Sequence, residues 1–154
     1  MKHLIILLTL LALSMVACQR KQPSLEKVVK TEAAWKAQLT SDEYAVLRLK
    51  GTERAFTGSF HDSKEEGAYL CKACQLPVFS SDSKFDSGTG WPSFSMPVNQ
   101  QYVLELPDTT YGMMRTEIVC ARCDSHLGHV FNDCPEPTGL RYCINSLSLS
   151  FQAE

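Results

Sequence analysis

Cysteine is the residue type that offers the most chemistry in this chain, which has 154 residues and seven cysteines. Four of the seven form two Cys-x-x-Cys pairs, Cys71 with Cys74 and Cys120 with Cys123. This spacing lets one tight turn present two sulfurs to a single ion, and four thiolates suit tetrahedral Zn²⁺ at about 2.3 Å. Residues 75–119 separate the pairs, so we expect the metal to clamp two separate hairpins rather than one small finger.

Two disulfides, or one redox-active pair, are the alternative for these four cysteines, because an exported chain meets an oxidising compartment. A disulfide within Cys-x-x-Cys closes a very small loop and therefore constrains the unfolded chain little. We favour a closed, structural zinc site that leaves no open position for water.

A fifth cysteine, Cys143, stands near the C-terminus in a run with a two-residue period over residues 140–151. Such a period predicts one β-strand, whose side chains alternate between two faces. One predicted face carries Cys143, Asn145, Leu147, Leu149 and Phe151, and the other carries Ser146, Ser148 and Ser150. A cysteine on an apolar face is more often an inert core residue than a nucleophile, so the surrounding residues decide its role.

Two of the four histidines, His126 and His129, are separated from Cys143 by a short segment that contains Pro and Gly. A thiol with a pKa of about 8.5 is only a few per cent thiolate at neutral pH, so a reactive cysteine needs a cationic or hydrogen-bonding neighbour. The candidates for that neighbour are His129, His126 and Arg141. Zinc ligation is the rival interpretation of the histidines, although four cysteines already complete a tetrahedral site.

A third unusual stretch is Gly-Thr-Gly-Trp-Pro-Ser-Phe at residues 88–94. Its glycines permit positive φ, so we expect a loop that displays Trp91 and Phe94. An indole on such a loop either packs into the core or forms the wall of a pocket for a small apolar group.

The composition, 44% hydrophobic and 21% charged, is that of an ordinary globular protein, and the length favours one domain. It excludes a disordered tail, a collagen and a polytopic membrane protein. The formal net charge is −2 and Lys and Arg form no cluster, which argues against nucleic acid as a partner.

Residues 1–17 are typical of a secretory signal that is removed, because Lys2 precedes an apolar run too short to span a bilayer. Residues 18–24 are polar and form the predicted tether. The preceding Met-Val-Ala-Cys resembles a bacterial lipobox, with Met where Leu is usual, which predicts lipidation of Cys18. An ordinary signal peptide with a free Cys18 thiol is the alternative. We expect an exported protein on the periplasmic side of the envelope, and resemblance to bacterial lipoproteins at Gln19 favours the outer membrane.

Residues 25–154 form the predicted domain. Apolar residues at helical spacing predict a first helix between Leu25 and Leu39. Thr40 and Glu43 match the capping box of a second short helix. Beyond Gly51, glycines and prolines punctuate short runs rich in Val, Ile, Phe and Tyr, a pattern typical of antiparallel strands. We therefore predict a mainly β domain with short N-terminal helices.

Together these blocks closely resemble the B-type peptide-methionine (R)-S-oxide reductases, from about Trp35 to Phe151. Several motifs occur in one order with plausible spacing, which makes the resemblance specific. The motifs are Gly-Thr-Glu-Arg at 51–54 with Phe-Thr-Gly at 56–58, Lys-Glu-Glu-Gly at 64–67, both Cys-x-x-Cys pairs, Gly-Trp-Pro-Ser-Phe at 90–94, His-Leu-Gly-His-Val-Phe at 126–131, and Arg-Tyr-Cys-Ile-Asn-Ser at 141–146.

This resemblance implies a single domain of two antiparallel sheets, with structural zinc set away from the catalytic site. It implies that Cys143 is the nucleophile and that Trp91 packs against the methyl group of the substrate, with Phe131 also in the binding pocket. The residues that would bind and polarise the sulfoxide oxygen are His126, His129 and Asn145. A sulfoxide oxygen leaves poorly until it is protonated, so an attacking thiolate needs an acid. The expected products are methionine and a Cys143 sulfenic acid.

The sulfenic acid must then be reduced. Many family members use a resolving cysteine two residues before the loop tryptophan, where this chain has Thr89. Apart from Cys143, Cys134 is the one cysteine that is assigned neither to the zinc site nor to lipidation. Either Cys134 forms a disulfide with Cys143, or it is a bystander and an external thioredoxin-like thiol acts directly. The expected partners are thus oxidised proteins and a thioredoxin-like reductant, and we expect a monomer.

Two other classes of protein compete with this interpretation. A zinc-ribbon interaction module explains the cysteine pairs but leaves Cys143, the two histidines and the Trp91 loop without a role. A general disulfide reductase explains Cys134 and Cys143 but predicts indifference to sulfoxide chirality.

Overall fold

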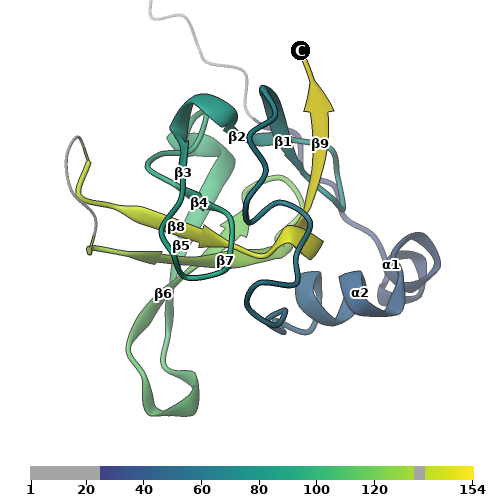
Figure 1. Cartoon of the computed structure of the whole chain (residues 1–154). Coiled ribbons are helices and arrows are strands. Elements are labelled where there is room, and N and C mark those ends of the chain that lie inside the picture. The colour runs from purple at the N-terminus through teal and green to yellow at the C-terminus, as the bar shows by residue number, and fades with distance from the viewer. Residues whose placement is uncertain (1–24, 134–137) are drawn as a thin grey trace, which may run out of the picture.

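Two antiparallel sheets form the body of the protein in the computed structural model, which describes residues 25–133 and 138–154 (Figure 1). The helices are α1 (Glu32–Gln38) and α2 (Ser41–Leu47). The strands are β1 (Gly67–Cys71), β2 (Pro77–Ser80), β3 (Lys84–Phe85), β4 (Ser93–Phe94), β5 (Val103–Asp108), β6 (Arg115–Cys120), β7 (His126–Phe131), β8 (Arg141–Ile144) and β9 (Leu149–Ala153). Short 3-10 turns lie at η1 (Ser81–Ser83), η2 (Gln100–Tyr102), η3 (Thr110–Gly112) and η4 (Ser146–Ser148).

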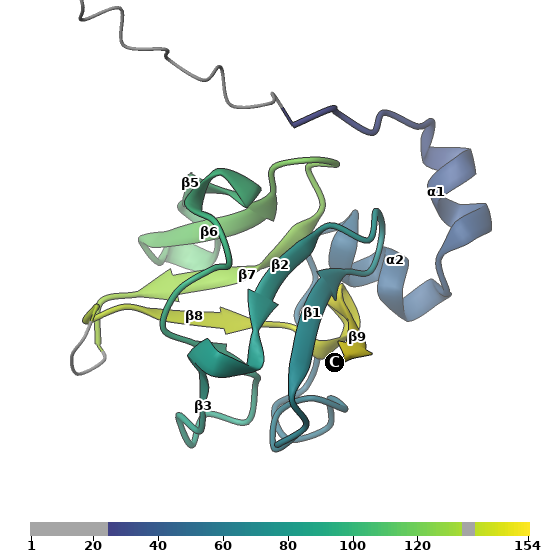
Figure 2. The ribbon, with the colours of Figure 1, turned by 90° about the horizontal axis from the view of Figure 1, so that it is seen from above.

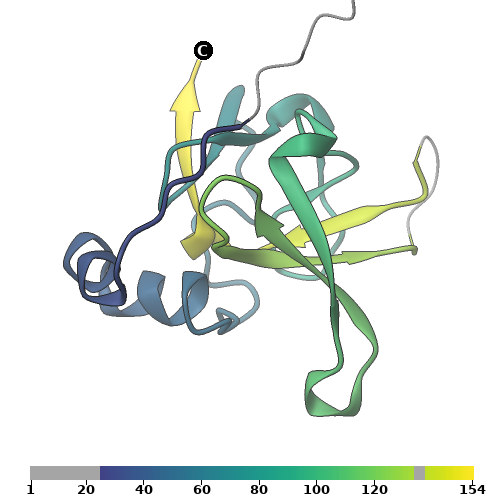
Figure 3. The same ribbon diagram turned by 180° about the vertical axis from the view of Figure 1, so that it is seen from behind.

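The strand order is β2-β1-β9 in the smaller sheet and β3-β4-β8-β7-β6-β5 in the larger one. The prediction of a mainly β domain with two antiparallel sheets and short N-terminal helices is confirmed. Figure 2 shows the sheets from above, and Figure 3 shows the β5–β6 hairpin extending away from the rest of the larger sheet. The predicted signal at residues 1–17 and the tether at 18–24 lie outside the described residues.

The N-terminal helix is shorter than its apolar spacing predicts. Residues 25–30 form neither helix nor strand, and the helix begins only after Thr31, whose side chain accepts a hydrogen bond from the Ala34 amide. The Val28 amide instead donates to the Arg122 carbonyl at 2.7 Å, so a tertiary hydrogen bond replaces the helical one. Among the described residues, no helix has the length and apolar character needed to cross a membrane.

The second helix follows its prediction closely. Thr40 caps it and accepts a hydrogen bond from the Glu43 amide, while the Glu43 carboxylate accepts one from the Thr40 amide. This reciprocal pair satisfies two amides that lack helical partners. The capping box is therefore confirmed.

The core lies between the two sheets and is rich in aromatic rings. Tyr69, Phe79, Phe94 and Tyr142 are among the largest fully buried side chains. Phe79 and Phe94 stack with ring centroids 4.5 Å apart, and Tyr69 meets Phe94 edge to face at 5.1 Å. Phe94 was predicted on a loop, but it lies on β4. Its ring packs against Tyr69 and Phe79 in the core and does not line the pocket.

The predicted single strand over residues 140–151 is wrong. It is two strands in different sheets, β8 and β9, joined by the turn η4. Ser146 and Ser148 are buried in this turn, and the Ser148 hydroxyl donates to the His126 carbonyl at 3.0 Å. The alternating pattern correctly predicts a strand at each end of this run, but hydrogen bonds from the Ser146 and Leu147 amides to the distant Glu53 carboxylate hold a turn between them.

A bulge in β7 brings two histidines to one side of the sheet. Residues three apart on a regular strand point to opposite faces. The register between β6 and β7 shifts so that Val119 pairs with His126 while Ile118 pairs with Gly128, which leaves Leu127 as the extra residue. As a result, the rings of His126 and His129 lie 5.4 Å apart.

Candidate active site and metal centre

Four cysteines meet at the ends of two hairpins, as their spacing predicts. Cys71 and Cys74 flank the turn after β1, and Cys120 and Cys123 flank the turn after β6. Their sulfurs all lie within 4.8 Å of one another, with Cys71–Cys123 at 3.6 Å and Cys74–Cys120 at 3.5 Å. Sulfurs bound tetrahedrally to Zn²⁺ at about 2.3 Å stand roughly 3.8 Å apart, so this cluster fits that ion.

The chemistry of the cluster also favours a soft cation. Hydrogen bonds from neighbouring thiols, Cys120 first, hold the pKa of Cys123 far below its usual range. The pKa of Cys71 rises because its thiol acts as a donor to the others. Cys71, Cys120 and Cys123 are buried and Cys74 is half-buried, so four sulfurs this close can all ionise only beside a cation. An all-sulfur set selects zinc over calcium or magnesium. Among the described residues, the cluster of metal-ligand type consists of these cysteines and includes neither His126 nor His129.

The N-terminal part of the domain braces both metal-binding turns. The Gln38 side-chain amide donates to the Ala73 carbonyl at 2.7 Å, inside the first Cys-x-x-Cys. The Arg48 guanidinium donates to the Cys123 carbonyl at 3.1 Å, and the Val28 amide bonds to Arg122 within the second. These bonds orient the turns that carry the ligands, which is the usual task of groups surrounding a metal site.

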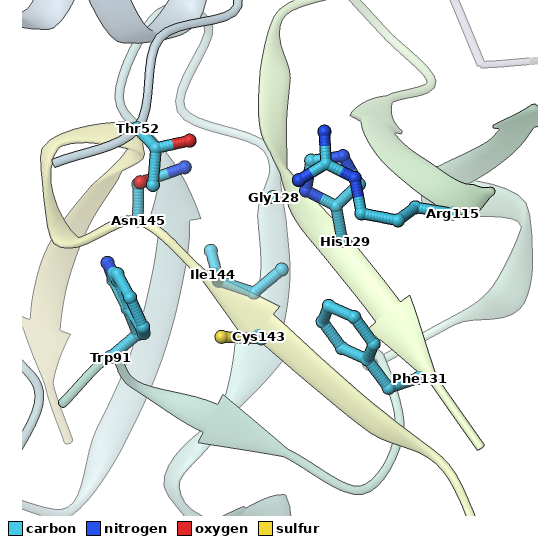
Figure 4. A pocket seen from close by; sticks show the side chains of 9 residues that line it. All are labelled: Thr52, Trp91, Arg115, Gly128, His129, Phe131, Cys143, Ile144 and Asn145. Carbon is cyan, nitrogen blue, oxygen red and sulfur yellow. The ribbon is translucent and has the colours of Figure 1, made fainter. Parts of the chain in front are cut away.

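Cys143 lies in the middle of the larger sheet rather than on a loop. On β8 it pairs with Ser93 of β4 on one side and with His129 of β7 on the other. Directly paired residues project from the same face. A pocket of about 120 Å³ opens on that face, and its walls are Thr52, Trp91, Arg115, Gly128, His129, Phe131, Cys143, Ile144 and Asn145 (Figure 4).

Gly128 allows the two strands that carry Cys143 and His129 to come together. A Cβ atom at Gly128 would lie 2.1 Å from the Cys143 carbonyl oxygen, well inside contact distance. Glycine is therefore required at the point where β7 approaches β8.

The Cys143 thiol is predominantly protonated in the free protein. Burial raises its pKa, and the positive charge of Arg141 and a hydrogen bond with Thr89 offset this effect only in part. Arg141 also forms hydrogen bonds at 2.9 and 2.6 Å to both Asp133 oxygens and lies 4.5 Å over the Phe131 ring. Part of the cationic charge near the thiol is thus compensated by a carboxylate.

Aromatic rings stand on both sides of the thiol. Figure 4 shows Trp91 on one side of Cys143 and Phe131 on the other. The Trp91 indole nitrogen donates to the Glu53 carbonyl at 3.1 Å, which fixes the ring at the pocket rather than in the core. Of the two interpretations of Trp91, the wall of a pocket is therefore the one that the structure supports.

His129 reaches the pocket with its tautomer already fixed. Its Nε2 donates to the Asp108 carboxylate at 2.8 Å, and Arg115 donates to the same carboxylate oxygen at 2.7 Å. Hydrogen bonds from Thr110, with His129 and Arg115, hold the pKa of Asp108 well below its usual range, so the carboxylate stays charged. Because the carboxylate binds Nε2, the Nδ1 atom of His129 can form a hydrogen bond with a ligand.

His126 does not line the Cys143 pocket. It is buried next to His129, and both histidines line an adjoining cavity between residues 49–52 and the β5–β6 hairpin. Burial lowers the pKa of His126, so the ring is neutral, and its Nδ1 donates to Glu117 at 2.8 Å. Its Nε2 atom has no hydrogen-bond partner among the described residues.

Asn145 lines the pocket, but the backbone occupies both ends of its amide. The oxygen accepts from the Glu53 amide at 3.1 Å, and the nitrogen donates to the Leu127 carbonyl at 3.1 Å. The three polar residues implied by the resemblance are therefore placed differently: His129 and Asn145 at the pocket, and His126 in the cavity beside it.

Several pocket residues carry no local sequence signal. Arg115 opens β6, and Thr52 follows the helices within a motif whose individual roles the sequence does not reveal. Asp108 ends β5 and reaches His129 only because the strands pair in this register. Cys134 and Cys18 lie outside the described residues, so the predictions on them stay predictions.

Comparison with known proteins agrees with this arrangement of a sheet-borne thiol pocket and a separate four-cysteine centre. The chain matches the SelR domain over residues 39–153. It is 62% identical over 122 residues to a peptide methionine sulfoxide reductase MsrB of Thiobacillus denitrificans, covering 79% of this chain and 92% of the relative. It is 55% identical over 128 residues to MsrB proteins of Pseudomonas putida and Leptospira interrogans, covering 83% of this chain and 96% and 98% of those relatives.

These matches and the fold define the class as a SelR-domain protein. The chain belongs to the MsrB family of peptide methionine sulfoxide reductases, which confirms the resemblance seen in its motifs.

Purified protein is expected to contain about one zinc per chain, measured by atomic emission, because four thiolates complete a tetrahedral site. Cys74→Ser removes one ligand and should abolish this content. It should also lower the melting temperature, since the binding free energy of a structural metal contributes to folding. Cys143→Ser is the matched control and should keep both its zinc and its melting temperature. Full zinc occupancy in Cys74→Ser would contradict the assignment.

Proposed function

We propose that this protein reduces methionine (R)-sulfoxide residues in oxidised proteins to methionine, with Cys143 as nucleophile. The observation that carries the proposal is the placement of Cys143 between Trp91 and Phe131, with His129 directly opposite it across the β7–β8 pair. One thiol, two apolar walls and one imidazole are what a methyl sulfoxide needs from a binding pocket.

In the proposed reaction, the Cys143 sulfur attacks the sulfur of the substrate. The Nδ1 atom of His129 takes the proton of the thiol as the sulfur–sulfur bond forms, and it passes this proton to the sulfoxide oxygen. The sulfur–oxygen bond then breaks, and the released hydroxide attacks the Cys143 sulfur. This breaks the sulfur–sulfur bond, so that Cys143 is left as a sulfenic acid and the substrate leaves as a thioether. Asp108 holds the imidazole in position for this transfer. The methyl group lies against Trp91, and the asymmetry of the walls selects one epimer.

The metal has a structural role in this proposal. Zn²⁺ bound by Cys71, Cys74, Cys120 and Cys123 would tie the β1–β2 hairpin to the β6–β7 hairpin. It supplies no chemistry to the sulfoxide.

With dithiothreitol as reductant, the protein should reduce the R epimer of a blocked methionine sulfoxide and leave the S epimer untouched. Each epimer is followed by chiral chromatography. Cys143→Ser should lose on the order of 10³-fold or more in kcat/KM, because it removes the attacking atom. Equal turnover of both epimers, or reduction of a disulfide substrate instead, would favour a general thiol reductase.

Cys134 resolves the sulfenic acid in this proposal. Arg141, two residues before Cys143 on β8, holds both oxygens of Asp133, the residue that precedes Cys134 in the sequence. Attack of the Cys134 thiol on the sulfenic sulfur forms a disulfide and releases water, and a thioredoxin-like dithiol then reduces the disulfide. The Thr89 side chain forms a hydrogen bond with Cys143 but carries no thiol, so it cannot act as the resolving residue.

After one turnover without reductant, wild-type protein should contain a Cys134–Cys143 disulfide, detected by peptide mapping. Cys134→Ser should instead accumulate a Cys143 sulfenic acid that dimedone traps. A persistent sulfenic acid in the wild type would show that Cys134 is a bystander and that an external thiol reduces Cys143 directly.

The protein acts as a monomer on the periplasmic side of the envelope, anchored to the outer membrane by a lipid on Cys18. The support is the apolar run within residues 1–17, the lipobox-like sequence before Cys18 and the polar residues 18–24. A repair enzyme in that place would serve exported proteins.

Mass spectrometry of the membrane fraction should find an acylated Cys18 at the N-terminus of the mature chain. Cys18→Ser should release the protein from the membrane, because the lipid is the anchor. A soluble wild-type product cleaved at another residue would remove the anchor from the proposal while leaving the enzymatic one in place.

A further inference from the structure

Glu53 has an unusual position behind the pocket wall. It lies on the loop between α2 and β1, the residue is only 8% exposed, and it does not line the Cys143 pocket. Its main chain nevertheless forms hydrogen bonds with two side chains that line the pocket. Its carboxylate forms hydrogen bonds with the two residues that follow Asn145. The segment containing Thr52 and the side chains of Trp91 and Asn145 converge at this end of the pocket (Figure 4).

The main chain of Glu53 holds two pocket side chains at once. Its carbonyl accepts from the Trp91 indole nitrogen at 3.1 Å, and its amide donates to the Asn145 side-chain oxygen at 3.1 Å. Trp91 comes from the loop before β4 and Asn145 from the end of β8. One peptide segment therefore sets the position of two groups that the sequence places far apart.

The carboxylate of Glu53 fixes the chain immediately after β8. Its two oxygens accept from the Ser146 amide at 2.6 Å and from the Leu147 amide at 2.9 Å. These amides open the turn η4, where no earlier carbonyl is available to them. Hydrogen bonds to an ionised acceptor are stronger than neutral ones, so the charge of Glu53 stabilises the bend that follows Cys143 and Asn145.

The chain packs tightly against this carboxylate at Gly58, and Glu53 also lines a cavity of about 370 Å³ together with Ser146 and Leu147. A Cβ atom at Gly58 would lie 2.5 Å from a Glu53 oxygen and 2.2 Å from the Ser146 hydroxyl. The glycine lets the chain pack directly against the carboxylate, and the amides of Ser146 and Leu147 bind its two oxygens.

We infer that Glu53 is a positioning residue of the sulfoxide pocket, acting through Trp91 and Asn145. The inference rests on the proposed function only for its kinetic consequence. The structural part, which does not depend on that function, is that Glu53 holds the Trp91 indole and the bend after β8 in one geometry. The reactivity of Cys143 itself depends on burial, Arg141 and Thr89, none of which requires Glu53.

Glu53→Gln tests this inference, because the amide group keeps the size of the side chain but turns an NH₂ donor toward a backbone amide donor. The variant should raise KM for the R-sulfoxide about 10-fold or more, with a smaller fall in kcat, because loss of pocket preorganisation weakens binding first. The pH profile of Cys143 alkylation, read by peptide mapping, should match the wild type. Glu65→Gln, an exposed glutamate away from the pocket, is the matched control and should change neither quantity.

A spectroscopic measurement keeps the test independent of activity. The chain has two tryptophans, and Trp35 is a buried internal reference. In Glu53→Gln, hydrogen exchange of the Trp91 indole N–H, followed by NMR, should accelerate at least about 10-fold while that of Trp35 stays unchanged. Accelerated exchange in a protein that reduces neither epimer would overturn the proposed function but retain the positioning role.

A double-mutant cycle with Trp91→Phe separates positioning from general destabilisation. Trp91→Phe removes the indole donor, so adding Glu53→Gln should cost less kcat/KM than in the wild-type background. If Glu53→Gln folds poorly, Glu53→Asp, which keeps the charge on a shorter arm, should give intermediate exchange and KM. Wild-type KM and unchanged Trp91 exchange in Glu53→Gln would overturn the inference, as would strictly additive effects in the cycle.

Discussion

The close approach of β7 to β8 at Gly128 is the constraint on which the rest of the site depends. Because Gly128 has no side chain, the Cys143 carbonyl can lie where a Cβ atom would otherwise stand. The β7–β8 register then places His129 opposite Cys143, and the β4–β8 register places Ser93 on the other side. The candidate nucleophile is thus positioned by backbone pairing on rigid strands, which holds a reacting atom more tightly than a loop does.

The metal centre and the pocket are separate sites joined by one hairpin. β6 ends at Cys120 and β7 begins three residues after Cys123, so the metal-binding turn fixes the start of the strand that carries both histidines. Hydrogen bonds from Arg48 and from the Val28 amide hold that turn from the N-terminal part of the domain. A metal far from the thiol can therefore influence the pocket through the register of β6 and β7, without contact with the substrate.

The sequence predicts what is local and periodic, and fails where distant segments decide. The cysteine pairs and the capping box at Thr40 depend on short spacings, and both predictions hold. The two-residue period near the C-terminus suggested one strand, because nothing in it shows that a carboxylate 93 residues earlier captures the Ser146 amide. The position of His126 likewise depends on a bulge, and the roles of Arg115 and Asp108 depend on strand register rather than on any motif.

Burial of Cys143 has a consequence for how the proposed reaction can be selective. The raised pKa keeps the sulfur as a thiol in the free protein, and the pairing of Arg141 with Asp133 limits the compensating positive charge. A thiol reacts more slowly than a thiolate with general oxidants and electrophiles. In the proposed reaction the sulfoxide accepts a proton through His129 as the thiol loses its own, so nucleophile and leaving group are activated together. The pocket then reserves the reactivity of Cys143 for a ligand that carries an oxygen able to take that proton.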